Sequence, residues 1–356
     1  MMNIFCDTYN NFNNISINDD TPKINLSNCD WINKFKNIFI NQNISEWTTT
    51  KLKITNKFPS FIEKNIFMSE KIKKWILKNS FYKIKYKNDN YGKLSVYAKK
   101  TSDYYNNIIF LKLIQTLQCY TTKKEVNVTI ILTNFKKELP INKNQPIECH
   151  NVNTGVSNGY NIILWRKEEI TKVLIHELIH HYELDFGNFR DENNIPNIDM
   201  NRIKVHNENK IIINEAITEI IATILNCVLC SLNINKDITK LLTYETWHSF
   251  MQTAKILNHY NFESFEEFLG LSESNKMLIE KTNVYAYYII RSLLMFDLPN
   301  VIELLNINNK RNITNYKKLK KKIYVYDEYI EIINWLLKQN NFDNSLIMTI
   351  CCCLFN

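Results

Sequence analysis

The stretch Val173-Leu-Ile-His176-Glu177-Leu-Ile-His180-His181 decides how this chain of 356 residues is interpreted. In an α-helix, His176 and His180 lie one turn apart on the same face, which is the spacing that two imidazoles need to bind one zinc ion. Glu177 follows His176 directly, so its carboxylate projects beside the metal and can accept a proton from water. The apolar residues between them favour a buried helix. We therefore expect one Zn²⁺ per chain.

A catalytic zinc needs a third protein ligand, and a later helix offers one. The segment Asn214-Glu215-Ala-Ile-Thr-Glu219 places two carboxylates on one face of an otherwise apolar helix, where they are unfavourable without a cation. We predict that Glu215 is the third ligand and that Glu219 accepts a hydrogen bond from a ligand histidine. The alternative is a charged stripe that faces solvent. The rival ligands are Glu219 itself, Glu183, Asp185 and Glu208.

The surrounding segments predict an α+β fold. Apolar, β-branched runs predict three strands at residues 126–133, 151–157 and 160–165, ahead of a motif helix over residues 167–184 with Glu168 and Glu169 in its first turn. Helical periodicity recurs before the strands and throughout the C-terminal half. The further predicted helices cover residues 70–83, 104–120, 210–232, 237–259, 278–296 and 325–338.

These elements predict three regions. Residues 1–100 form an Asn-rich N-terminal region that is helical in part. Residues 101–190 form an upper lobe with a small mixed sheet and the motif helix, and residues 191–356 form a mainly helical lower lobe that carries the third ligand. The zinc ion is expected in the cleft between these two lobes.

The residues His176, Glu177, His180, Glu215 and Glu219 resemble the motif of the gluzincin zinc metallopeptidases. In that group, HExxH on one helix is joined by a glutamate in an NExxxD setting on a later helix. Here a glutamate replaces the aspartate, and 215 − 180 = 35 residues separate the third ligand from the second histidine. The chain also resembles uncharacterised metallopeptidase-like proteins of large DNA viruses. The resemblance covers about residues 100 to 230 and implies a zincin-like fold.

The resemblance implies a zinc metallopeptidase that hydrolyses the peptide bonds of a peptide or protein substrate. Glu177 would take a proton from zinc-bound water and return it to the leaving amine. The strand around Thr154 and Gly155 would be the edge to which an extended substrate adds. The candidates for an oxyanion-stabilising or proton donor are His248, Tyr285 and Tyr288, with the neighbouring Tyr287 and Arg291 and with His206; each is alternatively a packed core or interface group.

Two other functions agree with the same residues. The chain could be a zinc-containing host-interaction protein on a zincin scaffold, although such a site has no need of Glu177 as a base. It could also be a zinc hydrolase that acts on a non-peptide amide.

The composition limits the partners. Lys and Arg exceed Asp and Glu by 44 − 36 = +8, while Gly and Pro number only 5 and 6 and Asn, Ile and Lys are over-used. This bias is typical of an A/T-rich genome, such as that of a large DNA virus or a protist. The charge is therefore no evidence for a nucleic-acid partner, and we expect the lysine-rich run at residues 316–322 to be a solvated helix face.

The chain is expected to be intracellular, in the cytoplasm, or in the host cytoplasm if it is viral. No apolar run reaches the roughly 18 residues of a transmembrane segment, and the N-terminus lacks the pattern of a signal peptide. The nine cysteines are then expected to be reduced thiols, with Cys227 and Cys230 in the core. Cys353 is a candidate for lipidation, and a plain apolar tail is the alternative.

Overall fold

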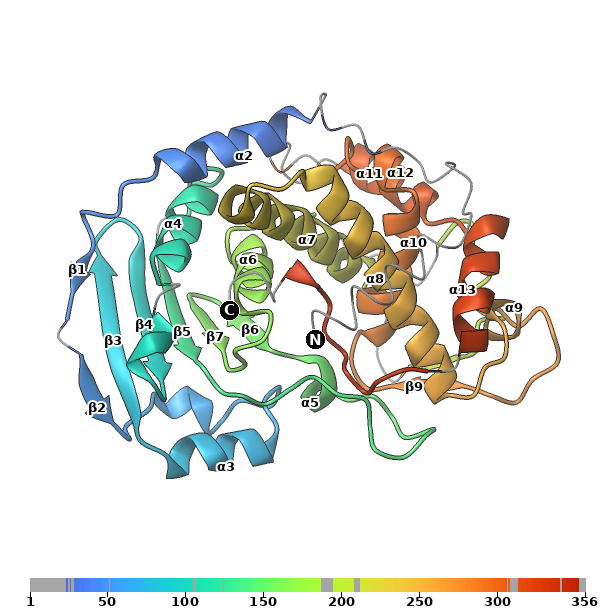
Figure 1. Ribbon diagram of the computed structural model, residues 1–356, viewed down its shortest axis with the longest axis horizontal. Coiled ribbons are helices and arrows are strands. Elements are labelled where there is room, and N and C mark those ends of the chain that lie inside the picture. The colour runs from blue at the N-terminus through green and yellow to red at the C-terminus, as the bar shows by residue number, and fades with distance from the viewer. Residues whose placement is uncertain are drawn as a thin grey trace.

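A mixed sheet and a helical assembly make up the molecule (Figure 1). This confirms the α+β class with a small mixed sheet and a mainly helical C-terminal part. The computed structural model describes residues 24, 26, 29–50, 52–104, 107–123, 125–186, 195–207, 212–305, 307, 313–339 and 341–351. Two residues named above, Glu208 and Cys353, lie outside these ranges.

The sheet contains β1 (Thr48–Thr49), β2 (Lys53–Thr55), β3 (Phe81–Asn88), β4 (Gly92–Ala98), β5 (Val126–Ile131), β6 (Gly155–Asn158) and β7 (Asn161–Leu164). The strand order is β1-β3-β4-β5-β7-β6, with β2 as a second partner of β3. The central pairs β4–β5 and β5–β7 are parallel, while β3–β4 and β6–β7 are antiparallel. Strand β6 therefore ends this order, one strand beyond the parallel centre.

Helices cover both faces of the sheet. Successive residues of a strand point to opposite faces, so β5 sends Ile130 to one side and Ile131 to the other. Ile130 joins the main core together with α4 (Asn107–Gln118) and α6 (Ile170–His181). Ile131 joins a smaller core beneath α3 (Glu70–Lys78). The helix that carries the histidines is thus supported from below by the sheet.

Two long helices organise the C-terminal part. Helix α7 (Ile213–Ile234) packs against α6, and α8 (Ile238–His259) packs against α7. Asp237 caps α8 by accepting a hydrogen bond from the Thr239 amide. The other elements are α2 (Asp30–Asn41), α5 (Cys149–Val152), β8 (Val205–Asn207), α9 (Phe265–Phe268), β9 (Leu278–Glu280), a π-helix (Tyr285–Ile290), α10 (Arg291–Phe296), α11 (Leu298–Val301), α12 (Ile313–Lys322), α13 (Asp327–Gln339) and the 3₁₀ turns Ser60–Ile62 and Thr101–Tyr104.

Some predicted elements are wrong in type. The spacing predicts that Phe81 and Tyr82 continue a helix, but α3 ends at Lys78 and both aromatic residues begin β3, where β4 provides a partner. The helix predicted at residues 278–296 is instead a strand, a π-helix and a short α-helix, because β9 pairs with β8. The strand predicted at residues 151–157 begins only at Gly155.

Helix α7 is long and apolar enough to cross a membrane, and it is the one such helix among the described residues. In the fold, 78% of its most apolar window is buried. A helix that is apolar on all sides belongs in a protein core or in a membrane, and the packing of α7 against α6 and α8 supports the first. This is consistent with the predicted lack of a transmembrane segment.

The C-terminal segment 341–351 passes between the sheet side and the helices (Figure 1). On one side, the Leu346 amide donates to the Lys137 carbonyl at 3.0 Å. On the other side, Glu245 of α8 accepts hydrogen bonds from the Ile350 and Cys351 amides, both at 3.1 Å. The segment therefore ties the two parts of the molecule together.

A close approach of β4 to β5 depends on Gly92. This glycine has a φ of +99°, and a Cβ there would collide with the Val126 carbonyl, at the pair where the parallel ladder begins. We predict that Gly92→Ala lowers the free energy of unfolding by about 3 kcal/mol or more, measured by urea denaturation. Gly159→Ala is the matched control, because φ is +59° there and a Cβ meets no atom within 4 Å. It should cost only about 1 kcal/mol; equal losses would contradict the prediction.

Candidate metal centre

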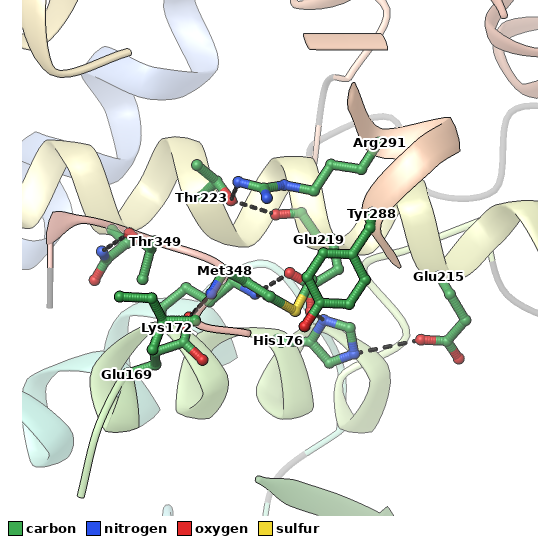
Figure 2. A network of polar contacts seen from close by, with 12 residues as sticks. Glu169, Lys172, His176, Glu215, Glu219, Thr223, Tyr288, Arg291, Met348 and Thr349 are labelled. Carbon is green, nitrogen blue, oxygen red and sulfur yellow. Dashed lines mark hydrogen bonds and ion pairs between the residues drawn. The ribbon is translucent and has the colours of Figure 1, made fainter. Parts of the chain in front are cut away.

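Helices α6 and α7 bring the three predicted ligands together. His176 and His180 leave one face of α6, and Glu215 faces them from the first turn of α7. The Nε2 atoms of the two histidines lie 3.0 Å apart, and Glu215 Oε2 lies 3.4 Å from each of them. Figure 2 shows His176 and Glu215 pointing toward each other from their two helices. The three atoms thus surround one point.

This arrangement fits a zinc ion. Bonds of about 2.0–2.1 Å at tetrahedral angles separate two ligand atoms by about 3.3 Å, close to the distances found here. Glu215 Oε2 is buried, and its contacts of 3.4 Å with the two imidazole nitrogens are long for hydrogen bonds. Two imidazoles and one carboxylate are also the ligands of zinc sites that keep a fourth position for water or substrate.

The charges of the site favour a neutral His176 and an ionised Glu215, which are the forms that bind a metal. Burial, helped by the neighbouring His180, lowers the pKa of His176 to about 4. Burial alone would raise the pKa of Glu215, but the charge on His180 and the hydrogen bonds with both histidines outweigh it and hold this pKa far below its usual value. Burial also disfavours a charged His180, but Glu215 and Asp185 raise the pKa of His180 well above 6.5. A metal ion would displace that proton.

A carboxylate lies at the other ring nitrogen of each histidine. Glu219 Oε1 is 2.9 Å from His176 Nδ1, a buried nitrogen that forms no hydrogen bond among the described residues. Asp185 Oδ2 lies 2.6 Å from His180 Nδ1 and accepts a hydrogen bond from Asn214 at 3.0 Å. Such carboxylates fix the tautomer and the orientation of a ligand histidine.

The rival ligands therefore have other positions. Glu219 Oε1 lies 2.9 Å from Nδ1 of the His176 ring, on the side away from Nε2. Asp185 lies against His180, a role that the sequence did not indicate, because the chain turns back after α6 through Glu183, whose φ is +53°. The Glu183 side chain forms an ion pair with Lys123 at 2.8 Å.

Glu177 is buried beside these ligands, and the edge strand β6 approaches it closely. A Cβ at Gly155 would lie 3.0 Å from Glu177 Oε1, so glycine lets the strand pass next to the carboxylate. Burial raises the pKa of Glu177 to about 7, although the charge on His180 and a hydrogen bond from the Ser157 backbone oppose the rise. A carboxyl group with this pKa can accept and return a proton near neutral pH. Thr154, just before β6, is itself buried.

The donors named from the sequence are engaged elsewhere. His248 Nε2 lies 2.9 Å from the Ile347 carbonyl, and Tyr288 donates to the Leu346 carbonyl at 2.7 Å. Tyr285 is 1% exposed and packs against Phe268. These three residues therefore match the alternative of packed core groups. Arg291 is buried and donates to Thr223, and His206 is exposed on β8.

Tyr287 is the residue of this tyrosine cluster that faces the site. Its ring lies 6.4 Å from the His176 ring. Burial, together with the charges of Glu215 and Glu177, raises the pKa of Tyr287 well above 10. The residue belongs to the π-helix, a rare geometry that is frequent at functional sites and that no sequence pattern marks. The sequence indicated the tyrosine cluster, but it did not show which tyrosine lies nearest the candidate ligands.

Comparison with known proteins gives one distant relative. No family model matches the chain, and no solved structure matches it. An uncharacterised protein of Acanthamoeba polyphaga mimivirus is 27% identical over 183 residues, which are 48% of this chain and 45% of that protein. The chain thus spans less than half the length of this relative. The relative is viral, in agreement with the expectation from composition and motif, and its name assigns no activity.

We predict that the purified chain binds about one zinc ion and that His176→Ala, His180→Ala and Glu215→Ala each abolish stoichiometric binding, because each removes one of three converging ligand atoms. Elemental analysis after dialysis against buffered zinc measures this. Asp185→Asn should keep the stoichiometry but weaken the affinity about 10- to 100-fold. Glu183→Gln, which removes a carboxylate from the same turn, is the control and should bind zinc normally. Full zinc content in Glu215→Ala would exclude Glu215 as a ligand.

Proposed function

We propose that this chain is a zinc-dependent metallopeptidase with a gluzincin-like site on a zincin-like fold. The observation that carries the proposal is the position of Glu177. This buried carboxylate lies beside three converging ligand atoms and next to an open sheet edge. A zinc site that only stabilises a fold has no use for a base of this kind. A protein that merely binds a host partner is therefore a weaker alternative.

The chemistry divides between the metal and the chain. Bound zinc would polarise a carbonyl group and lower the pKa of water. Glu177 then serves as general base, because its pKa of about 7 lets it take a proton from the attacking water and pass it to the departing amine. Asp185 and Glu219 hold the two imidazoles in place during this exchange.

The substrate is proposed to be an extended peptide that pairs with β6. This strand pairs with β7 on one side, and the described residues place no further strand on its other side. An unpaired edge binds an extended segment through backbone hydrogen bonds. Because Gly155 and Ser157 both lie against Glu177, a peptide on this edge would bring its backbone to the base. The edge favours a peptide over a non-peptide amide.

Tyr287 is proposed to donate a hydrogen bond to the oxyanion that forms on the substrate carbonyl. Its raised pKa keeps the phenol protonated at neutral pH, and it lies among Glu215, Glu177 and His176. The viral relative supports the further proposal that the enzyme is viral.

Glu177→Gln should keep zinc and lose hydrolysis, because the amide has nearly the same shape but cannot accept the proton. We expect the rate of peptide cleavage to fall about 100- to 10,000-fold, measured by mass spectrometry of a digested peptide library. Removal of zinc from the wild type with a chelator should have the same effect, and Glu183→Gln should cleave normally. Undiminished cleavage by Glu177→Gln would exclude the proposed base.

Tyr287→Phe should lower kcat about 10- to 1,000-fold with little change in KM or zinc content, because only the hydroxyl that faces the reacting carbonyl is lost. Steady-state kinetics on a cleaved peptide would show this. Tyr288→Phe is the matched control from the same π-helix. Its hydroxyl bonds the Leu346 carbonyl, so its loss should lower Tm and leave kcat unchanged. Equal kcat values for the two variants would remove Tyr287 from the mechanism.

A further inference from the structure

The facing sides of α6 and α7 carry a row of charged groups that continues beyond the metal ligands (Figure 2). On α6, Lys172 lies one turn before His176, and on α7, Glu219 lies one turn after Glu215. Lys172 Nζ donates to Glu219 Oε2. The other oxygen, Glu219 Oε1, is the one that lies 2.9 Å from His176 Nδ1. Lys172 thus reaches the metal centre through a single carboxylate.

Because Lys172 and Glu219 are buried, their side chains have few alternative orientations. The Lys172 side chain is 1% exposed and that of Glu219 is 6% exposed. A buried amine without a partner is costly, so Lys172 and Glu219 are held together. Because one Glu219 oxygen is committed to Lys172 and the other faces His176, the carboxylate has little freedom to rotate. The orientation of the His176 ring is set in turn by that carboxylate.

A second buried ion pair lies at the start of α6 and contacts the C-terminal segment. Lys137 Nζ is 2.7 Å from Glu169 Oε2, and their side chains are 3% and 0% exposed. Glu169 was expected in the first turn of the helix, but it precedes α6 and accepts a hydrogen bond from the Met348 amide of the C-terminal segment. This pair is as buried as the first, and the charge of Glu169 acts on Lys172, but none of the hydrogen bonds described for the pair reaches His176 or Glu219.

We propose that Lys172 is a positioning residue for the metal centre. By holding Glu219 Oε2, it keeps Glu219 Oε1 against His176 Nδ1 and so aims His176 Nε2 at the metal position. The inference rests on the proposed zinc site and extends it by a residue that no motif in the sequence indicated. The functional pattern on α6 then reads Lys172, His176, Glu177 and His180, matched on α7 by Glu215 and Glu219.

The test compares zinc affinity in two variants that each remove one buried amine. Metal-free protein competes for zinc with a chromophoric chelator. Lys172→Met should weaken the affinity about 10- to 100-fold, whereas the control Lys137→Met should change it less than about 2-fold, although both lower Tm. The visible spectrum of the cobalt-substituted protein should shift in Lys172→Met only. Should Lys172→Met fail to fold, Lys172→Gln carries the same expectation.

A double-mutant cycle tests whether Lys172 acts through Glu219. Glu219→Gln alone should weaken zinc binding, and adding Lys172→Met should weaken it no further. Multiplied effects in the double variant, or equal affinities of Lys172→Met and Lys137→Met, would overturn this inference while leaving the zinc site intact. A wild-type chain that binds no zinc would overturn both the inference and the proposed function.

Discussion

The packing of α6 against α7 is the constraint on which the rest of the structure depends. The interface buries the His176 imidazole, the Glu219 carboxylate and Lys172 among apolar side chains, and it holds His180 and Glu215 half-buried. Each buried charge costs several kcal/mol unless it is paired, so every polar group in the interface needs a particular partner. Lys172, near the start of α6, pairs with Glu219, and His180, near the end of α6, pairs with Glu215. The order of the partners along α7 is therefore the reverse of their order along α6. A shift of one turn would leave charges at both ends without partners.

The other elements hold this helix pair in a useful position. The parallel centre of the sheet supports α6 from below, and the edge strand β6 passes beside Glu177, where a glycine allows close contact. The C-terminal segment contacts both the sheet side and α8, and it meets α6 through Glu169. The candidate base, the candidate ligands and the open strand edge are therefore held by the same packed elements, as the proposed hydrolysis would require.

Much of the candidate site was predictable because its spacing is local. His176 and His180 share a face through helix geometry alone, and Glu215 was identified because a carboxylate on an apolar helix needs a cation. The errors arose where a pattern depends on a distant partner. Phe81 and Tyr82 fit a helix by spacing, but the strand β4 decided otherwise. The sequence likewise did not predict which tyrosine of the cluster faces the site. Tyr287 does so because it belongs to a π-helix, and the π-helix depends on the packing of the surrounding residues.

The sequence by itself determined the α+β class and pointed to the candidate ligands and the candidate base, because periodicity and residue type depend on near neighbours. Only the tertiary structure decided which groups support them. Asp185 reaches His180 because the chain turns back at Glu183, and Lys172 reaches Glu219 across 47 residues of sequence. Such contacts depend on how helices and strands pack, and packing brings together residues that no local spacing relates.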